Sequence, residues 1–211
     1  MKVLIAGANG KIGRRLIPHL VADNIQVRAM VRDLRQKADL EILGAHEVVE
    51  ADLEGDCRQA LEGQDAVIFT AGSGPDTGPE KTIAVDQNGA ISLIDQAKEQ
   101  GVGRFIMVSS MRADDPASGP EKLRHYFAAK GKADDHLRAS GLNYTIVRPG
   151  RLTEEPPLEK VDIAEKLKSF GDISREDVAK VLSETARREL PNKEFDVIAG
   201  STPIRDALDA L

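Results

Sequence analysis

The sequence predicts an α/β protein in which helices cover both faces of a doubly wound, mainly parallel sheet. Two observations lead to this prediction. Short apolar runs rich in β-branched residues alternate with longer segments of helical periodicity along most of the 211 residues. Single glycines, Gly101 and Gly141, follow two of the helical segments, and a glycine commonly ends a helix in this way. Strands that alternate with helices form βαβ units, which build parallel sheets.

The first half of the chain contains most of the expected strands. These are Lys2–Ala6, Gln26–Val31, His46–Glu50, Ala66–Thr70 and Arg104–Val108. The helices expected between them are Lys11–Ala22, Asp33–Leu43, Cys57–Leu61 and Lys81–Gln100. Helical spacing of apolar residues predicts one buried face in the first helix, formed by Ile12, Leu16, Ile17 and Leu20. The same reasoning predicts an inward face in the last helix, formed by Ile83, Ile91, Ile94 and Ala97.

The second half begins with a helix at Glu121–Ser140 and a strand at Tyr144–Val147, which Pro149 is expected to stop. Residues 158–170 fit either two short strands or a helix. Ser174 and Asp177 have the spacing of a capping box, so a helix is expected from there to about Arg188. A last strand at Glu194–Ile198 and a helix at Pro203–Leu211 complete the expected elements.

Composition excludes several classes of protein. The net charge of −6 offers no basic surface for nucleic acid or an anionic membrane. A lone cysteine, Cys57, rules out an internal disulfide framework and fits a reducing compartment. No apolar run approaches the roughly 18 residues that a membrane span needs. We therefore expect a cytoplasmic protein without nucleic-acid or membrane partners.

A glycine-rich turn, Gly7-Ala8-Asn9-Gly10-Lys11-Ile12-Gly13, connects the first strand to the first helix. In such a turn Gly7 makes the sharp bend, Gly10 lets a pyrophosphate approach the backbone, and Gly13 lets helix and strand pack closely. The amide groups and dipole of the following helix attract the phosphates. The alternative is a structural turn without a ligand.

Further motifs follow the later strands in a fixed order. They are Ala51-Asp52-Leu53, Thr70-Ala71-Gly72, Val108-Ser109-Ser110, the pair Tyr126 and Lys130, and Arg148-Pro149-Gly150. With the glycine turn, this order resembles the atypical branch of the short-chain dehydrogenase/reductase superfamily. That branch includes NmrA-like, flavin-reductase-like and NAD-dependent epimerase/dehydratase-like proteins. The resemblance covers about residues 1–153, and more faintly the helix from Ser174, and implies a Rossmann-type fold.

This resemblance implies one NAD(P)-binding domain over residues 1–211. Residues 1–153 would form its cofactor-binding core, and residues 154–211 a substrate-side region with the terminal strand and helix. Asp52 would accept a hydrogen bond from adenine, with Leu53 packed nearby, although the alternative for Asp52 is a turn-forming residue. The cofactor-binding residues would be Gly7, Asn9, Gly10, Lys11, Ile12, Gly13, Arg32, Asp52, Leu53, Ala71, Gly72, Lys130, Pro149 and Gly150.

The end of the second strand bears on the choice between NAD and NADP. NAD-binding proteins usually place an acidic residue there to accept from the ribose 2′-hydroxyl. Arg32 occupies or adjoins this place, and a guanidinium suits a 2′-phosphate, with Arg14 close enough to assist. Asp33 next to it argues for NAD, and Arg32 paired with Asp33 on the surface is the alternative. We expect NADP in preference to NAD.

Tyr126 and Lys130 are expected to lie on one face of a helix, because they are four residues apart. An ammonium near a phenol favours the phenolate and lowers its pKa, which is ordinarily about 10. The pair would then exchange a proton while a hydride moves to or from the nicotinamide. The alternative is a structural tyrosine at the edge of the core. Ser109 and Ser110 are the candidates to polarise a substrate carbonyl.

Two departures from the family pattern weaken the expectation of an active enzyme. Met111 occupies the position where many epimerase relatives place the serine or threonine, and Asp86 stands where relatives often have asparagine. The expected function is therefore an NADP-dependent oxidoreductase or epimerase-type enzyme. The alternative is an NADP-binding redox sensor without catalysis, of the NmrA-like kind.

The substrate is expected to be a small molecule, such as a carbonyl or sugar-like compound. It would contact the less regular segments, which are 73–79, 111–120 and 152–170. The glycine- and proline-rich segment 72–79 suits the border of a pocket or a lid. No set of histidine, cysteine and carboxylate residues has the spacing of metal ligands, so no metal is expected. The sequence leaves the oligomeric state open.

Overall fold

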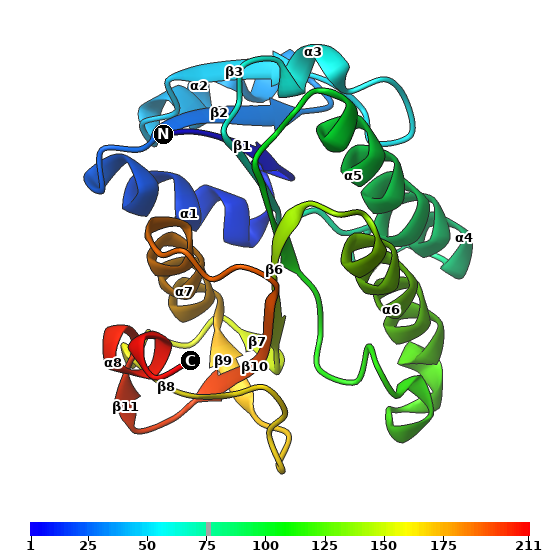
Figure 1. Cartoon of the computed structure of the whole chain (residues 1–211), viewed down its shortest axis with the longest axis vertical. Helices are drawn as coiled ribbons and strands as arrows, with labels where there is room; N and C mark the ends of the chain where they lie inside the picture. Colours follow the sequence, from blue (N-terminus) through cyan, green and yellow to red (C-terminus); the bar gives the residue numbers. More distant parts are fainter. Residues whose placement is uncertain (75–76) are drawn as a thin grey trace.

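The computed structural model describes residues 1–74 and 77–211 and has a Rossmann-like α/β architecture (Figure 1). One large sheet has the strand order β11-β8-β10-β6-β5-β4-β1-β2-β3. Every pairing from β3 to β10 is parallel, whereas β8 pairs antiparallel with β10 and with β11. Its strands are β1 (Lys2–Ala6), β2 (Gln26–Val31), β3 (Glu47–Glu50), β4 (Ala66–Phe69), β5 (Arg104–Val108), β6 (Asn143–Pro149), β8 (Lys160–Ala164), β10 (Lys193–Ala199) and β11 (Thr202–Pro203).

Helices cover both faces of this sheet, as expected. They are α1 (Lys11–Ala22), α2 (Lys37–Ile42), α3 (Arg58–Leu61), α4 (Pro79–Thr82), α5 (Ala90–Glu99), α6 (Arg124–Ala139), α7 (Arg175–Arg187) and α8 (Ile204–Asp209). Alternate residues of each strand point to opposite faces. In β1, Val3 and Ile5 join the core beneath α1 and α7, whereas Leu4 and Ala6 join the core beneath α5 and α6. Figure 1 shows these two helix pairs on either side of β6.

The expected helix over 81–100 is only partly correct. The helical segment starts at Pro79, and Ile83–Gly89 is a π-helical stretch before α5 begins. A π-helical turn contains more residues than an α-helical turn and therefore changes which side chains face the core. Ile94 and Ala97 are buried, but the prediction for Ile83 is wrong because its side chain is 44% exposed. In this π-helical stretch the side chain of Asp86 is buried instead.

The segments after the sixth expected strand also differ from expectation. Strand β6 continues through Pro149 instead of ending at Val147, and the Pro149 carbonyl accepts a hydrogen bond from the Met111 amide at 3.1 Å. Residues 158–170 contain the strand β8. A second small sheet pairs β7 (Arg151–Thr153) with β9 (Asp172–Ser174), and the sequence pattern did not predict it. The expected cap of α7 is confirmed, because Ser174 Oγ accepts from the Asp177 amide at 2.9 Å.

In the part of the chain that the structure describes, no helix combines the length and apolar character needed to cross a membrane.

Candidate functional site

The glycine turn after β1 is packed so closely that two of its glycines have no room for a side chain. Gly7 has a φ of +86°, and a Cβ atom there would lie 2.6 Å from the backbone nitrogen of Ala71. A Cβ atom on Gly13 would lie 2.5 Å from the Gly7 carbonyl oxygen. Both distances are far below van der Waals contact. The turn therefore packs closely on the chain after β4 at Ala71 and on its own backbone at Gly13.

Gly10 differs from these two glycines. A Cβ atom there would meet only the Gly7 carbonyl oxygen, at 3.1 Å. Gly10 is also the N-terminal cap of α1, and no side chain caps the first amide groups of this helix. Uncapped amides at a helix N-terminus suit an anionic ligand. The turn thus fits the pyrophosphate of a dinucleotide on steric and electrostatic grounds.

The other residues of the turn have partners within the protein. Asn9 Oδ1 accepts a hydrogen bond from the Arg14 guanidinium at 2.8 Å. Lys11 is exposed and lies 3.0 Å from Glu154. Ile12 is buried in the core beneath α1. Asn9 therefore holds Arg14 beside the turn, and Lys11 links the turn to the segment after β7.

At the end of β2, Arg32 is exposed, and the half-buried Asp33 caps the short helical turn that follows it. The Asp33 carboxylate accepts hydrogen bonds from the amide of Arg35 at 2.9 Å and from its Nε at 2.8 Å. These bonds lower the pKa of Asp33. The carboxylate of Asp33, at the expected ribose position, is thus hydrogen-bonded to Arg35. Arg32 and Asp33 do not pair with each other among the described ion pairs.

Asp52 and Leu53 follow β3 and lie in different environments. Asp52 is exposed, and its Oδ1 accepts a hydrogen bond from the Glu54 amide at 3.0 Å, which is the turn contact considered as its alternative role. Leu53 is buried against the core beneath α5. A Cβ atom on Gly89 would approach Leu53 Cβ to 2.9 Å, so the π-helical stretch packs directly on this residue.

Helix α6 carries Tyr126 and Lys130 on one face, as predicted. The Lys130 ammonium lies 6.0 Å from the centroid of the Tyr126 ring. It donates a hydrogen bond to the Val108 carbonyl at 3.2 Å and lies 3.3 Å from Asp86 Oδ1. Asp86 is fully buried and also accepts from the Ser73 amide at 2.9 Å. The departure from the family pattern at Asp86 therefore produces a buried ion pair with Lys130.

The direction of the pKa of Tyr126 is opposite to our expectation. Burial raises it, and this effect outweighs the lowering by the Lys130 ammonium. The buried carboxylates Asp86 and Asp134 raise it further. Tyr126 is therefore a neutral phenol near pH 7, since the free value is already about 10. A neutral phenol can donate a proton but is a poor acceptor.

The two candidate serines after β5 lie in different positions. Ser109 is buried, and its Oγ donates to Asp134 Oδ2 on α6 at 2.5 Å. Ser110 lies beside Tyr126, where it contributes to the pKa of the phenol, and its Oγ also donates to the Met111 carbonyl. Met111 is buried. Geometry thus separates Ser110, which is near the phenol, from Ser109, which ties β5 to α6.

Asp134 itself was not predicted as a site residue. It lies four residues after Lys130, so it occupies the same face of α6 one turn further along. Its carboxyl group is buried, and Oδ1 has no hydrogen-bond partner in the described part of the chain. Burial raises the pKa of Asp134 to about 7. The four-residue spacing from Lys130 is the signal that could have indicated it.

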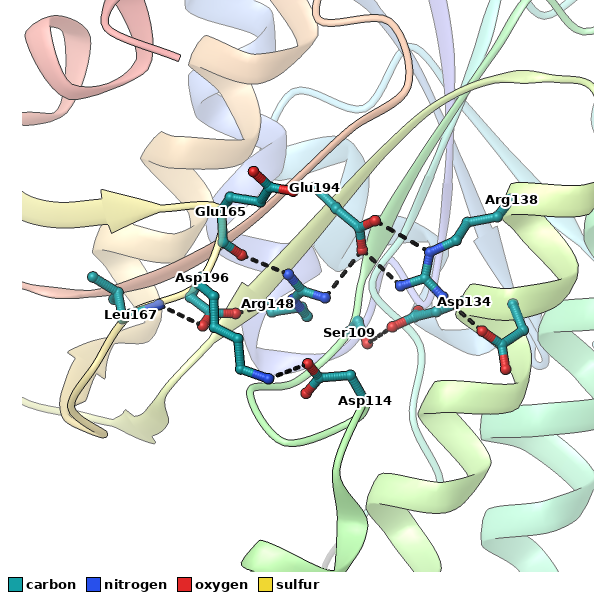
Figure 2. Close-up of polar contacts among 11 residues, drawn as sticks. Ser109, Asp114, Asp134, Arg138, Arg148, Glu165, Leu167, Glu194 and Asp196 are labelled. Atoms are coloured by element: carbon teal, nitrogen blue, oxygen red, sulfur yellow. Dashed lines mark hydrogen bonds and ion pairs between the residues drawn. The ribbon is translucent and has the colours of Figure 1, made fainter.

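Arg148, at the end of β6, forms a group of buried contacts that we call the Arg148 network (Figure 2). Its Nε donates to Asp196 at 2.9 Å, and its other nitrogens donate to Glu194 at 3.0 Å and to the Glu165 carbonyl at 2.7 Å. Glu194 also accepts from Arg138 of α6. The network fixes the strand end that leads into Pro149 and Gly150. An open hollow of about 530 Å³ beside it is lined by Asp114, Arg138, Arg148, Ala164, Glu165, Lys166 and Glu194.

The predicted residues thus fall into three groups. The carboxyl ends of β1, β4, β5 and β6 bring together Gly7, Ala71, Lys130, Ser110 and Pro149. Arg32, Asp52 and Lys11 lie on the surface around that centre, whereas Ser109 points into the protein. Of the segment 72–79, Pro75 and Asp76 lie outside the described residues. Within the described ranges no cluster of histidine, cysteine and carboxylate side chains could hold a metal ion.

Comparisons with known proteins agree with this geometry. Residues 7–189 match the family model of NAD(P)H-binding proteins. The chain is 48% identical to the sugar epimerase YhfK of Bacillus subtilis, itself uncharacterized, over the full length of both.

Two solved structures extend the comparison. One, from Bacillus halodurans and assigned as a NAD-dependent epimerase/dehydratase, is 45% identical, has a TM-score of 0.98 and is matched over the full length of both chains. Another, the oxidoreductase ylbE from Lactococcus lactis, is 30% identical with a TM-score of 0.87 and covers 100% of this chain and 96% of its own. The chain therefore belongs to the NAD(P)-binding, epimerase/dehydratase-like family of atypical short-chain dehydrogenases/reductases.

Proposed function

We propose that this protein is an NADPH-dependent reductase of a small carbonyl compound. The observation that carries the proposal is the group formed by the half-buried Tyr126 with the buried Lys130 and Asp86 at the ends of β4 and β5. Reduction of a carbonyl needs a proton donor, and Tyr126 is a neutral phenol. An epimerase needs the same group to remove a proton as well, so its high pKa favours reduction.

The glycine turn and the strand ends would hold the cofactor. Gly10 and the open amides of α1 suit the pyrophosphate, Leu53 and Asp52 border the adenine side, and Ala71, Gly72, Pro149 and Gly150 border the nicotinamide side. When bound, the nicotinamide supplies a hydride to the carbonyl carbon. Tyr126 then donates its hydroxyl proton to the carbonyl oxygen, and water restores that proton. Lys130 stabilises the transient phenolate, while Asp86 and the Val108 carbonyl hold the ammonium in place.

The preference for NADPH rests on the end of β2. Asp33 is engaged by Arg35, so the carboxylate that would accept from a ribose hydroxyl is occupied. Arg32 is exposed there, and Arg14, held by Asn9, lies 3.7 Å from Asp39 of α2, the helix that follows β2. Guanidinium groups bind a phosphate with charge-assisted hydrogen bonds. We expect Arg32→Gln to reduce NADPH affinity about tenfold relative to NADH affinity, in calorimetric titrations of both cofactors.

The reaction itself is tested by following NADPH oxidation with a panel of aldehydes and ketones. Tyr126→Phe removes the proton donor and should lower kcat by roughly 100-fold or more. NADPH binding by the variant should stay unchanged, because the phenol hydroxyl is not part of the cofactor site.

A different set of results would favour the sensor function. Met111 supplies no hydroxyl at the position where relatives place a serine or threonine. If no carbonyl compound is reduced while NADPH and NADP⁺ bind with very different affinities, the reductase proposal fails and redox sensing explains the site better.

A further inference from the structure

Arg112, two residues after Ser110, has an unusual backbone conformation. The amide of Ala113 donates to the carbonyl of Ser110 at 3.1 Å and closes a tight turn. Arg112 is the third residue of this turn and has a φ of +72°. Turns of this kind favour glycine at that position, and any other residue is strained. Such strain is often found at functional sites, so the side chain of Arg112 is a candidate for a role in binding.

The Arg112 side chain reaches across to a second segment of the chain. Its guanidinium carbon lies 4.1 Å from the centroid of the Phe170 ring. Phe170 is 42% exposed, which is unusual for a phenylalanine and leaves part of its ring open to a ligand. The next residue, Gly171, accepts a hydrogen bond from the Arg151 amide at 2.9 Å and so anchors Phe170 beside the end of β6.

The position of this pair points to the substrate. In open α/β sheets ligands bind outside the carboxyl ends of the strands. Arg112 follows the end of β5, and Phe170 lies next to the segment that follows β6. Tyr126 and Lys130 act at the same strand ends. The pair therefore lies on the substrate side of the expected nicotinamide position.

Among the described residues, no ion pair includes Arg112, whereas three basic residues near it are paired. Arg148 pairs with Asp196, Arg138 with Glu194, and Lys166 with Asp114. For Arg112, the described residues provide no carboxylate within ion-pair distance, and its guanidinium carbon lies over the Phe170 ring. Its N–H donors, which lie in the plane of the group, are free to bind an anion.

We propose that Arg112 and Phe170 form the substrate-recognition site, and that the substrate is a planar conjugated compound with a negatively charged group. Phe170 would stack on the ring system, and Arg112 would bind the charged group with paired hydrogen bonds. This inference rests on the proposed reductase function, because it assigns a substrate class to that site.

The test separates charge from planarity with three aldehydes. They are 6-formyl-2-naphthoate, its uncharged methyl ester, and the non-aromatic 4-formylcyclohexanecarboxylate. Binding is measured by NMR titration with saturating NADP⁺, so that no turnover is needed. We expect the naphthoate to bind about tenfold more tightly than either of the other probes.

Variants assign the two contributions to the two residues. Arg112→Gln should remove the preference for the naphthoate over its ester, and Phe170→Leu should weaken both aromatic probes and keep their ratio. Arg112→Gly should also remove the preference while relieving the backbone strain, so that its Tm is equal to or above that of the wild type. Arg187→Gln, which removes a partly exposed arginine on α7, is the matched control and should change nothing.

The inference is overturned if Arg112→Gln keeps the preference, if the ester binds as tightly as the naphthoate, or if no probe binds. Failure of the proposed function gives a different result. In that case the naphthoate binds with the expected preference, but NADPH does not reduce it or any other aldehyde.

Discussion

The glycine turn and the Arg148 network both position the site, but by opposite means. At the glycine turn, backbone packs against backbone, and the close approach of Gly7 to Ala71 and of Gly13 to Gly7 depends on the absence of side chains. In the Arg148 network, long charged side chains fill the space between α6, β6 and β10 (Figure 2). One region is held by steric fit and the other by buried charge.

This difference has consequences for stability and for function. Steric fit is local and nearly independent of pH and salt, because no charge is involved. Buried charges are stable only while all partners are present, since removal of one leaves another charge without compensation. The cofactor side should therefore tolerate changes of condition, and the substrate side should respond to them. Five substitutions test this contrast.

The largest effect is expected from Arg148→Met. The change keeps much of the side-chain volume but leaves Asp196 as a buried charge, with the Leu167 amide as its one remaining partner among the described hydrogen bonds. Removing one member of a buried pair costs about 3–5 kcal/mol of unfolding free energy. Urea unfolding measures the loss. Arg205→Gln removes an exposed arginine paired with Glu184 and should leave the midpoint nearly unchanged. A loss below about 1 kcal/mol for Arg148→Met would mean that the network contributes little.

Asp134→Asn should change how stability depends on pH. The pKa of Asp134 is raised to about 7 in the folded protein, and in the unfolded chain it is about 3.9. Between these values the folded state holds a proton that the unfolded state has lost, so the wild type loses stability as pH rises from about 4 to about 7. The free energy of unfolding of the wild type, relative to that of Asp134→Asn, should fall by up to about 4 kcal/mol over that range. Parallel pH profiles for the two proteins would contradict a raised pKa.

Two alanine variants of the glycine turn should differ from each other. In Gly13→Ala the new methyl group meets backbone oxygens of Gly7 and Ala8, and overpacking of this kind costs about 1–3 kcal/mol. In Gly10→Ala the methyl group meets one backbone atom, the Gly7 carbonyl oxygen at 3.1 Å, so it should cost less stability than Gly13→Ala. It should still weaken NADPH binding about tenfold or more, because the methyl group lies where the pyrophosphate approaches. Equal NADPH affinity of Gly10→Ala and the wild type would place the phosphates elsewhere.

The smallest effect is expected from Glu154→Gln. This exposed carboxylate lies 3.0 Å from Lys11 and 2.9 Å from both Arg15 and Arg175, and so links the glycine turn to the substrate side. Exposed pairs contribute little and are screened by salt. A small decrease in Tm should be measurable at low ionic strength and should disappear at about 1 M salt. A decrease that persists at high salt would show that Glu154 acts through packing instead.

The sequence predicted the cofactor side of the fold almost completely. Helix α1 has the expected bounds and inward face, because its apolar residues recur at a regular 3.6-residue spacing. The end of β2 was harder to interpret, since the sequence could not show whether Asp33 faces a ribose or Arg35. The burial of Ile83 was predicted incorrectly, because the π-helical stretch changes which side chains face the core and no residue type in the sequence indicates such a stretch.

The substrate side was less predictable for a physical reason. The strands β7, β8 and β9 are short and pair with segments far away in the sequence, so local propensity says little about them. Arg112 and Phe170 are separated by many residues and meet only because β5 and β6 end side by side. No spacing in the sequence relates them.

The sequence by itself therefore determined the α/β fold, the glycine turn and the pairing of Tyr126 with Lys130, because each depends on residues that are neighbours along the chain. Tertiary structure decided the chemistry of that pair. It half-buries Tyr126 within reach of the charges of Asp86 and Asp134, and the cost of placing a charge there outweighs the attraction of Lys130, so that the phenol keeps its proton. Burial and long-range charge contacts belong to the folded chain, and no local pattern records them.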